Sequence, residues 1–170
     1  CIRDSYDYMY ENAFWDGAQM TYGDGMQAFY PLTGDIDVIA HEINHGFTQY
    51  HSDLIYDQES GGLNESFSDV AGVAAEWFHE GTGADWLIGH DIARPGALPG
   101  DALRFMCDPT MDGLSIDHYD DYTPTVDVHF SSGIANKAFC RAAGRLSDPV
   151  NHDPATPPTV AGVQLAAQVW

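Results

Sequence analysis

The alternation of apolar and polar residues predicts a helix over residues 36–50. Apolar side chains recur there every three or four positions, which is the spacing of one buried helix face: Ile36, Ile39, Ile43, Phe47 and Tyr50. Thr33 or Asp35 is suited to cap its start. Because each residue turns a helix by about 100°, His41 and His45 leave it together, on a different side from the apolar stripe.

A second helical pattern covers residues 64–80 and follows a turn-like segment, SGGLN. Its apolar stripe consists of Phe67, Val70, Ala71, Ala74 and Phe78. Glu65, Asp69 and Glu76 share another face, since they lie four and then seven positions apart. A row of carboxylates repels itself, so we expect positive charge against this face.

The remaining segments predict smaller elements. Residues 13–32 are aromatic and broken by glycine-containing turns, as in short strands and hairpins. Residues 81–128 are rich in Gly, Pro and Asp and are predicted to be mostly loop. Residues 131–146 and 157–170 predict a third and a fourth helix, and residues 147–158 between them have a linker-like composition.

Composition indicates one globular domain with an acidic surface. The chain has 170 residues, of which 44% are hydrophobic, enough for a sizeable core. With 26 acidic and 6 basic residues the net charge is -20, which argues against nucleic acid or an anionic membrane as a partner. We interpret the scattered acids as a solvated surface, in preference to adaptation to high salt or a need for calcium.

Neither the start of the sequence nor its cysteines indicate the cellular compartment. The sequence has no apolar run long enough to cross a bilayer and no signal-peptide pattern at its start, but a mature secreted enzyme has lost that signal. The three cysteines, Cys1, Cys107 and Cys140, fit no CxxC metal pattern. Because their number is odd, their pairing is undecided.

The sequence HEINH, residues 41–45, carries the candidate chemistry. Two neutral imidazoles four positions apart on a helix can converge on one Zn²⁺, and Glu42 beside them is placed to act as a base. Histidines at this spacing also occur as ordinary surface residues, so the motif needs support. Glu65, on the first turn of the next predicted helix, can supply a third ligand. Asp69, one turn later, can accept the free N–H of a ligating histidine.

HEINH followed by GGLNESFSD resembles the thermolysin family of metallopeptidases, and most of all its vibriolysin and pseudolysin branch. Three more segments resemble the family in the same order: ENAFWDGAQMTYGDG its substrate-binding strand, ALRFMCDP its arginine segment and DVHFSSGIANKAF its catalytic-histidine segment. The resemblance covers about residues 5–142. It implies an α+β fold of the zincin type with two parts in one catalytic unit. Residues 1–52 hold a remnant of a β-rich N-terminal lobe and the central HExxH helix, and residues 53–170 form a mainly helical, incomplete C-terminal lobe.

The resemblance also implies the roles of the active-site residues. It implies one catalytic zinc ion with three protein ligands, His41, His45 and Glu65. Glu42 would activate the water that attacks the scissile carbonyl. His129 and Tyr56 would stabilise the oxyanion, and Asp127 would hold His129 in orientation. The residues that support the ligands from behind are Asp69 and Asn64.

A substrate cleft and a structural cation follow from the same resemblance. Asn12 and the backbone of Ala13 would align the peptide as an added strand, and Arg104 would bind a substrate carbonyl. The adjoining pocket for an apolar side chain would involve Leu103 and Val38. One structural Ca²⁺ is implied, with four ligands: Asp37, Glu76, Asp85 and the Leu87 carbonyl.

The function implied is that of a secreted, extracellular zinc endopeptidase, which cuts proteins or peptides on the amino side of bulky hydrophobic residues. It would act as a monomer, and a cleaved propeptide outside this chain is compatible with it. Two alternatives stay open. An inactive zinc-binding homologue, a scaffold or decoy, has no chemical need of the intact Glu42 and His129. A zinc aminopeptidase carries a GxMEN-type motif where this chain has NAFW. Because the family's catalytic domain is longer, we expect a fragment, a truncated product or a reduced member.

Overall fold

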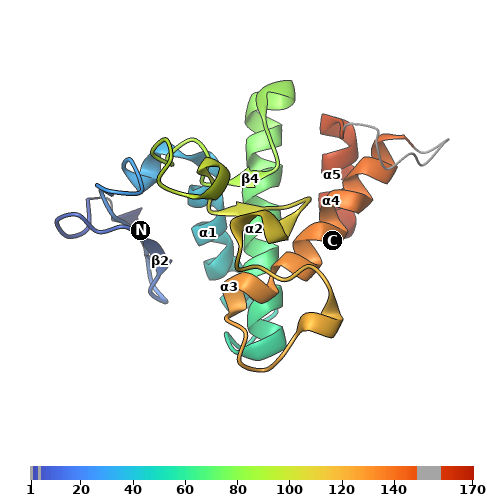
Figure 1. Ribbon diagram of the computed structural model, residues 1–170, viewed down its shortest axis with the longest axis horizontal. Coiled ribbons are helices and arrows are strands. Elements are labelled where there is room, and N and C mark those ends of the chain that lie inside the picture. Colours follow the sequence, from blue (N-terminus) through green and yellow to red (C-terminus); the bar gives the residue numbers. More distant parts are fainter. Residues whose placement is uncertain (1, 4, 149–157) are drawn as a thin grey trace.

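The computed structural model describes residues 2–3, 5–148 and 158–170. Figure 1 shows helices α1 and α2 at the centre, the N-terminal strands and loops on one side, and α4 and α5 on the other. The predicted α+β class is confirmed, with a small β region followed by a mainly helical part. Among the described residues, no helix combines the length and the apolarity needed to cross a membrane.

The N-terminal sheet has three short strands. β2 (Ala13–Trp15) pairs antiparallel with β3 (Met20–Tyr22), and β1 (Ile2–Arg3) pairs with β3 in parallel. The order β1-β3-β2 leaves β2 at one edge of this sheet. An edge strand keeps a row of backbone N–H and C=O groups that another peptide can pair with. The predicted strand content of residues 13–32 is thus confirmed for its first half.

Helix α1 (Ile36–His51) confirms the first predicted helix. Asp35 caps it, because its carboxylate accepts the N–H of Asp37 at 3.0 Å. The predicted burial of its apolar stripe is wrong, since Ile43, Phe47 and Tyr50 are 45%, 57% and 69% exposed. The buried face instead carries Val38, His41, Glu42 and Gly46. Periodicity identifies a face of a helix, but not which face the neighbouring elements cover.

Helix α2 (Gln58–Glu80) begins six residues before the predicted start, because SGGLN continues the helix. A side chain at Gly61 would lie 2.4 Å from Val128 Cγ1, and one at Gly62 would lie 2.5 Å from Ser131 Oγ. The two glycines therefore permit close packing against helix α3 (Val128–Ser131), and do not mark a turn. On α2 the polar face is buried as well, with Glu65, Asp69 and Glu76 inside. The predicted apolar stripe is buried only in part, since Val70 is 5% exposed and Phe78 78%.

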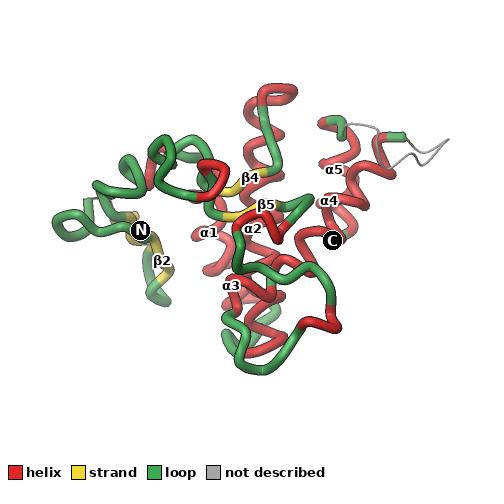
Figure 2. The backbone as a smooth tube through the Cα atoms, viewed as in Figure 1, coloured by secondary structure: helices red, strands yellow, loops and turns green. Residues whose placement is uncertain are grey.

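The segment between α2 and α3 is mostly loop, as predicted (Figure 2). It contains the antiparallel pair β4 (Leu87–Ile88) and β5 (Arg104–Phe105). Short 3-10 helices also occur. Leu32–Gly34 precedes α1, and the others lie between α2 and α3: Gly81–Gly83, Pro99–Asp101, Pro109–Asp112 and Tyr119–Asp121. Asp127 ends this segment and caps α3, because its carboxylate accepts the N–H of His129.

The C-terminal helices α4 (Gly133–Ser147) and α5 (Val160–Val169) confirm the third and fourth predicted helices. A disulfide joins Cys107, just after β5, to Cys140 on α4. It settles the pairing of two of the three cysteines, whereas Cys1 lies outside the described residues. The linker-like segment also falls largely outside them, at residues 149–157.

Two apolar clusters form the core. One lies among α2, α4 and α5, and its largest buried members are Trp77, Ile88, Met106, Phe139 and Val163. The other joins the N-terminal sheet to the start of α1: Ala13, Tyr22, Phe29, Leu32, Val38 and Ile92. Residues of both clusters line a cleft, and the candidate site lies in it.

Candidate active site

The cleft has a volume of about 720 Å³ and is lined by side chains from the edge strand β2, from α1 and α2, and from the segments that hold Arg104 and His129. It therefore collects residues separated by more than 100 positions in the sequence. Clefts that combine apolar walls with a few convergent polar groups are the usual form of ligand sites.

His41, His45 and Glu65 converge at the floor of this cleft. Their ligand atoms all lie within 4.8 Å of one another. The Nε2 atoms of His41 and His45 are 2.9 Å apart, and the two Glu65 oxygens lie 3.4 Å and 3.3 Å from them. Glu65 is fully buried. Within the described residues, no other group of three or more His, Cys, Asp or Glu side chains brings its ligand atoms this close together.

Hydrogen bonds fix the tautomers of both histidines. His41 Nδ1 lies 2.8 Å from Asp69 Oδ1, and His45 Nδ1 lies 2.8 Å from Asn64 Oδ1. The Asn64 amide donates to the Leu54 carbonyl, so its oxygen is the atom that faces His45. In the neutral rings that a metal ion requires, both Nδ1 atoms therefore carry the proton, and both Nε2 lone pairs face one another and Glu65.

This arrangement fits a zinc ion. Two facing lone pairs beside a buried carboxylate repel unless a cation lies between them, and Glu65 Oε2 has no hydrogen-bond donor among the described residues. Two imidazole nitrogens and one carboxylate oxygen form a typical catalytic zinc ligand set. Burial acts to lower the pKa of His41, but the Glu65 and Asp69 carboxylates outweigh it and raise that pKa to about 10. The site thus strongly favours positive charge.

Glu42 lies on α1 between the two histidines and lines the cleft. It is only 6% exposed, and its Oε2 has no hydrogen-bond partner among the described residues. Burial raises the pKa of the Glu42 carboxyl. A carboxylate with a raised pKa and a free oxygen is suited to accept a proton.

A second group of polar side chains lines the cleft beside Glu65. The Tyr56 hydroxyl donates to Glu65 Oε1 and lies 3.2 Å from His129 Nε2. His129 Nδ1 lies 2.7 Å from Asp127 Oδ1, so Asp127 orients the ring. Burial and the Glu65 charge raise the pKa of Tyr56, which keeps its phenol protonated and able to donate. Tyr56 and His129 are each about half exposed.

The predicted substrate residues all line the cleft: Asn12, Ala13, Val38, Leu103 and Arg104. Arg104 has a further role that the sequence does not reveal. Its Nε and Nη2 atoms donate to the two oxygens of Asp69 at 2.8 Å and 2.5 Å, and Nη2 lies 4.0 Å from Glu65 Oε2. This guanidinium is the positive charge expected against the acidic face of α2. Attraction to Asp69 and Glu65 outweighs burial and raises the pKa of Arg104, so it stays charged.

Asn136 contacts the site, although no sequence motif points to it. Its amide nitrogen donates to Asp69 Oδ2 at 2.7 Å from helix α4. The sequence feature that could have indicated it is a polar amide on the buried face of that helix, beside Gly133, Phe139 and Ala143. Such a residue requires a buried acceptor.

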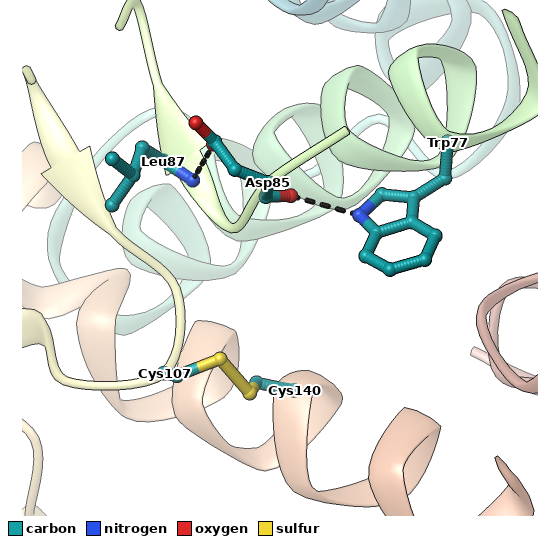
Figure 3. The surroundings of a disulfide bond; sticks show 5 residues. All are labelled: Trp77, Asp85, Leu87, Cys107 and Cys140. Atoms are coloured by element: carbon teal, nitrogen blue, oxygen red, sulfur yellow. Dashed lines mark hydrogen bonds between the residues drawn. A yellow bond between two sulfur atoms is a disulfide. The ribbon is translucent and has the colours of Figure 1, made fainter. Parts of the chain in front are cut away.

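The four predicted calcium ligands gather around the end of α2 and β4. Asp37 accepts the N–H of Gly89 at 3.0 Å, and Glu76 accepts that of Asp85 at 3.2 Å. Asp85 accepts the Leu87 N–H at 2.7 Å, as Figure 3 shows. Their ligand atoms do not converge as closely as those of the zinc group within the described residues. Calcium binding therefore stays a prediction.

The fold and the cleft together define a class of protein. A small sheet with an exposed edge, a HExxH helix and a carboxylate from the next helix are the parts of a zinc metallopeptidase catalytic unit.

Comparison with known proteins identifies the family: the chain belongs to the thermolysin metallopeptidases. Residues 3–49 match the thermolysin metallopeptidase catalytic domain, and residues 52–170 match the thermolysin metallopeptidase alpha-helical domain. Thermolysin itself is a standard example of a catalytic zinc held by two histidines and a glutamate.

Several relatives are about half identical to the chain over the residues that align. The neutral protease of Vibrio proteolyticus is 49% identical over 144 residues, which is 85% of this chain and 23% of that protein. A thermolysin of Alicyclobacillus acidocaldarius is 51% identical over 134 residues, 76% of this chain and 24% of that protein. The chain thus spans about a quarter of the length of these relatives.

A solved structure shows the same fold. The precursor of protealysin, a metalloproteinase from Serratia proteamaculans, superposes with a TM-score of 0.70 at 33% identity, over 96% of this chain and 66% of that one. The resemblance inferred from the sequence motifs is therefore confirmed.

Proposed function

We propose that the chain carries the active site of a zinc endopeptidase. The observation that supports this most is the convergence of His41, His45 and Glu65. Glu42 lies beside them in the same cleft, and its Oε2 has no hydrogen-bond partner among the described residues. Zinc in such a site supplies Lewis acidity and lowers the pKa of a bound water. The donors present fit that ion, and Asp69 and Asn64 hold the two rings in the tautomer it requires.

The chain's own residues divide the remaining work. Glu42 accepts the proton of the attacking water and passes it to the leaving amine. His129, oriented by Asp127, and the protonated Tyr56 hydroxyl donate hydrogen bonds to the negative charge that develops on the substrate carbonyl oxygen. Both donors lie close to Glu65, so they act at the zinc side of the cleft.

The substrate is proposed to bind as an added strand. Ala13 belongs to the edge strand β2, whose outer backbone groups can pair with an extended peptide, while Asn12 lies beside it. Leu103 and Val38 offer an apolar wall for a bulky side chain after the cut, and Arg104 offers a donor for a neighbouring carbonyl. These contacts support cleavage on the amino side of bulky hydrophobic residues.

We propose three more features of the whole protein. The enzyme is secreted and monomeric, and acts on proteins or peptides. A propeptide outside this chain is cleaved off, and the chain divides into residues 1–52 and 53–170. The intact Glu42 and His129 favour an active enzyme over an inactive zinc-binding homologue. The NAFW segment, with Ala13 and Phe14 in an open edge strand, favours an endopeptidase over an aminopeptidase.

We also propose one structural calcium ion at Asp37, Glu76, Asp85 and the Leu87 carbonyl. Burial and the neighbouring Asp35 raise the pKa of Asp37 well above its usual value, and burial raises that of Glu76 to about 7. Glu76 Oε2 has no hydrogen-bond partner among the described residues. Crowded carboxylates of this kind are suited to a hard cation with oxygen ligands.

Digestion of casein with and without a zinc chelator tests the endopeptidase proposal. Cleavage is expected to stop with the chelator and to return when zinc is added back, because the proposed chemistry requires the metal. The masses of the fragments should place most cuts before bulky hydrophobic residues. Cleavage that persists without metal would contradict the mechanism, and release of single N-terminal residues would favour the aminopeptidase.

A further inference from the structure

Asp69, behind the metal site, accepts four hydrogen bonds. Its Oδ1 faces His41 Nδ1 at 2.8 Å and Arg104 Nη2 at 2.5 Å. Its Oδ2 accepts from Arg104 Nε at 2.8 Å and from Asn136 Nδ2 at 2.7 Å. The side chain is fully buried. Because the carboxylate orients the His41 ring, whatever holds the carboxylate also holds that zinc ligand.

Asn136 reaches Asp69 from 67 positions further along the chain. It is 1% exposed, and its side-chain oxygen has no hydrogen-bond partner among the described residues. A buried amide costs folding free energy unless its hydrogen bonds are made. The bond to Asp69 is the side-chain interaction that accounts for this residue on an otherwise apolar helix face.

The disulfide connects the two segments that hold Asp69. Cys107 stands three residues after Arg104, and Cys140 stands four residues, about one helical turn, after Asn136. Figure 3 shows the bond crossing from the segment after the strand to the helix. The link limits how far β5 and α4 can separate, so the Arg104 and Asn136 donors stay in place against the same carboxylate.

We propose that Asn136 is a positioning residue of the zinc centre, which acts through Asp69 on the His41 ring, and that the Cys107–Cys140 disulfide holds its helix against the arginine strand. Arg104, on β5, donates hydrogen bonds to both oxygens of Asp69. Asn136 holds Oδ2 from α4, and so resists rotation of the carboxylate away from His41. The inference rests on the proposed zinc-dependent function.

The test is the zinc affinity of the Asn136→Leu variant, measured by competition with a chelator at one pH. Leu keeps the approximate size of the side chain and removes the donor. Zinc binding is expected to weaken by roughly tenfold or more, the usual effect of losing an outer partner of a metal ligand. Phe139→Leu is the matched control, because Phe139 is a buried residue of the same helix whose ring meets Trp86 and Trp170 and which has no side-chain donor to offer Asp69. It should lower the melting temperature and leave zinc affinity unchanged.

The disulfide is tested with the double variant Cys107→Ala/Cys140→Ala, which leaves neither cysteine free to pair with Cys1. We expect weaker zinc binding in the parent background and no further weakening in the Asn136→Leu background, since both changes act through Asp69. Equal and additive losses in the two backgrounds would overturn the proposed role of the disulfide.

The outcomes separate this inference from the proposed function. A parent chain that binds no zinc overturns both. If the parent binds zinc and a folded Asn136→Leu variant binds it equally tightly, the inference alone is overturned. The same holds if Phe139→Leu weakens zinc binding as much as Asn136→Leu does. If Asn136→Leu does not fold, Asn136→Ser is measured in its place, with the same expected loss and the same contradicting result.

Discussion

Replacement of Glu42 by Gln is expected to reduce peptide cleavage by roughly 10²–10⁴-fold, the usual contribution of a positioned acid-base group, while zinc stays bound. Gln keeps the size and the helix propensity of the side chain but cannot accept the proton of the water. Glu42 is not one of the three converging ligands, so its loss should not affect zinc content. Zinc content and cleavage are to be measured on the same preparations.

Two further variants make this result specific. Glu65→Gln should weaken zinc binding itself, because a neutral amide is a poor ligand for zinc. Glu59→Gln, the same exchange in the exposed first turn of α2, should change neither quantity. If Glu42→Gln cleaves as fast as the parent, Glu42 is not the base. If the parent binds zinc and cleaves nothing, the inactive-homologue alternative is correct.

Calcium is expected to give the largest change in stability. Saturation at 100 times the dissociation constant stabilises a folded protein by about 2.7 kcal/mol, provided that the ion does not bind the unfolded chain. In calcium-free buffer the folded state holds the protons of Asp37 and Glu76 more tightly than the unfolded state does, because both pKa values are raised. The stabilisation that these two protonated groups contribute is therefore complete below their unfolded-state pKa values, about 4, and is lost as the pH rises through about 7.

Urea unfolding between pH 5 and 8, with and without calcium, measures this effect. The charged neighbours that act on Glu76 are themselves carboxylates, Asp85, Asp35 and Glu80, so calcium should remove most of the decline and magnesium should not. Asp85→Ala should abolish the calcium response. Asp117→Ala, which removes the partner of Lys137 elsewhere, should preserve it. An equal response to calcium and magnesium would contradict the proposed site.

Much of the active site could be predicted because its chemistry is local. HEINH places two histidines and Glu42 on one helix, and the cap at Asp35 fixes where that helix begins. Glu65 and Asp69 lie on the next helix at positions that face the first. The sequence therefore predicts these residues to be close together, and the structure brings their side chains within hydrogen-bond range.

The burial of the two central helices could not be predicted in the same way. Apolar periodicity pointed to Ile43, Phe47 and Phe78 as inside, yet the described neighbours cover the polar faces. Those faces are stabilised by ion pairs and hydrogen bonds between α1, α2 and Arg104, a long-range arrangement that no single helix reveals. For the same reason the sequence SGGLN predicts a turn, whereas in the structure its glycines continue α2 and allow α3 to pack closely.

Long-range contacts also account for what the sequence left open. Cys107 and Cys140 are separated by 33 positions, and three cysteines allow several pairings. Asn136 has no motif of its own, and its role becomes visible only when α4 is packed against Asp69. Arg104 was recognised by resemblance as a substrate residue, while its ion pair with Asp69 needed the fold.

The most direct test of the central claim is anomalous diffraction at the zinc absorption edge from crystals of the zinc-loaded chain. One strong peak is expected between the Nε2 atoms of His41 and His45 and the carboxylate of Glu65, with Glu42 close by but not a ligand. A strong peak at another position, or no peak at these three residues in zinc-loaded crystals, would contradict it.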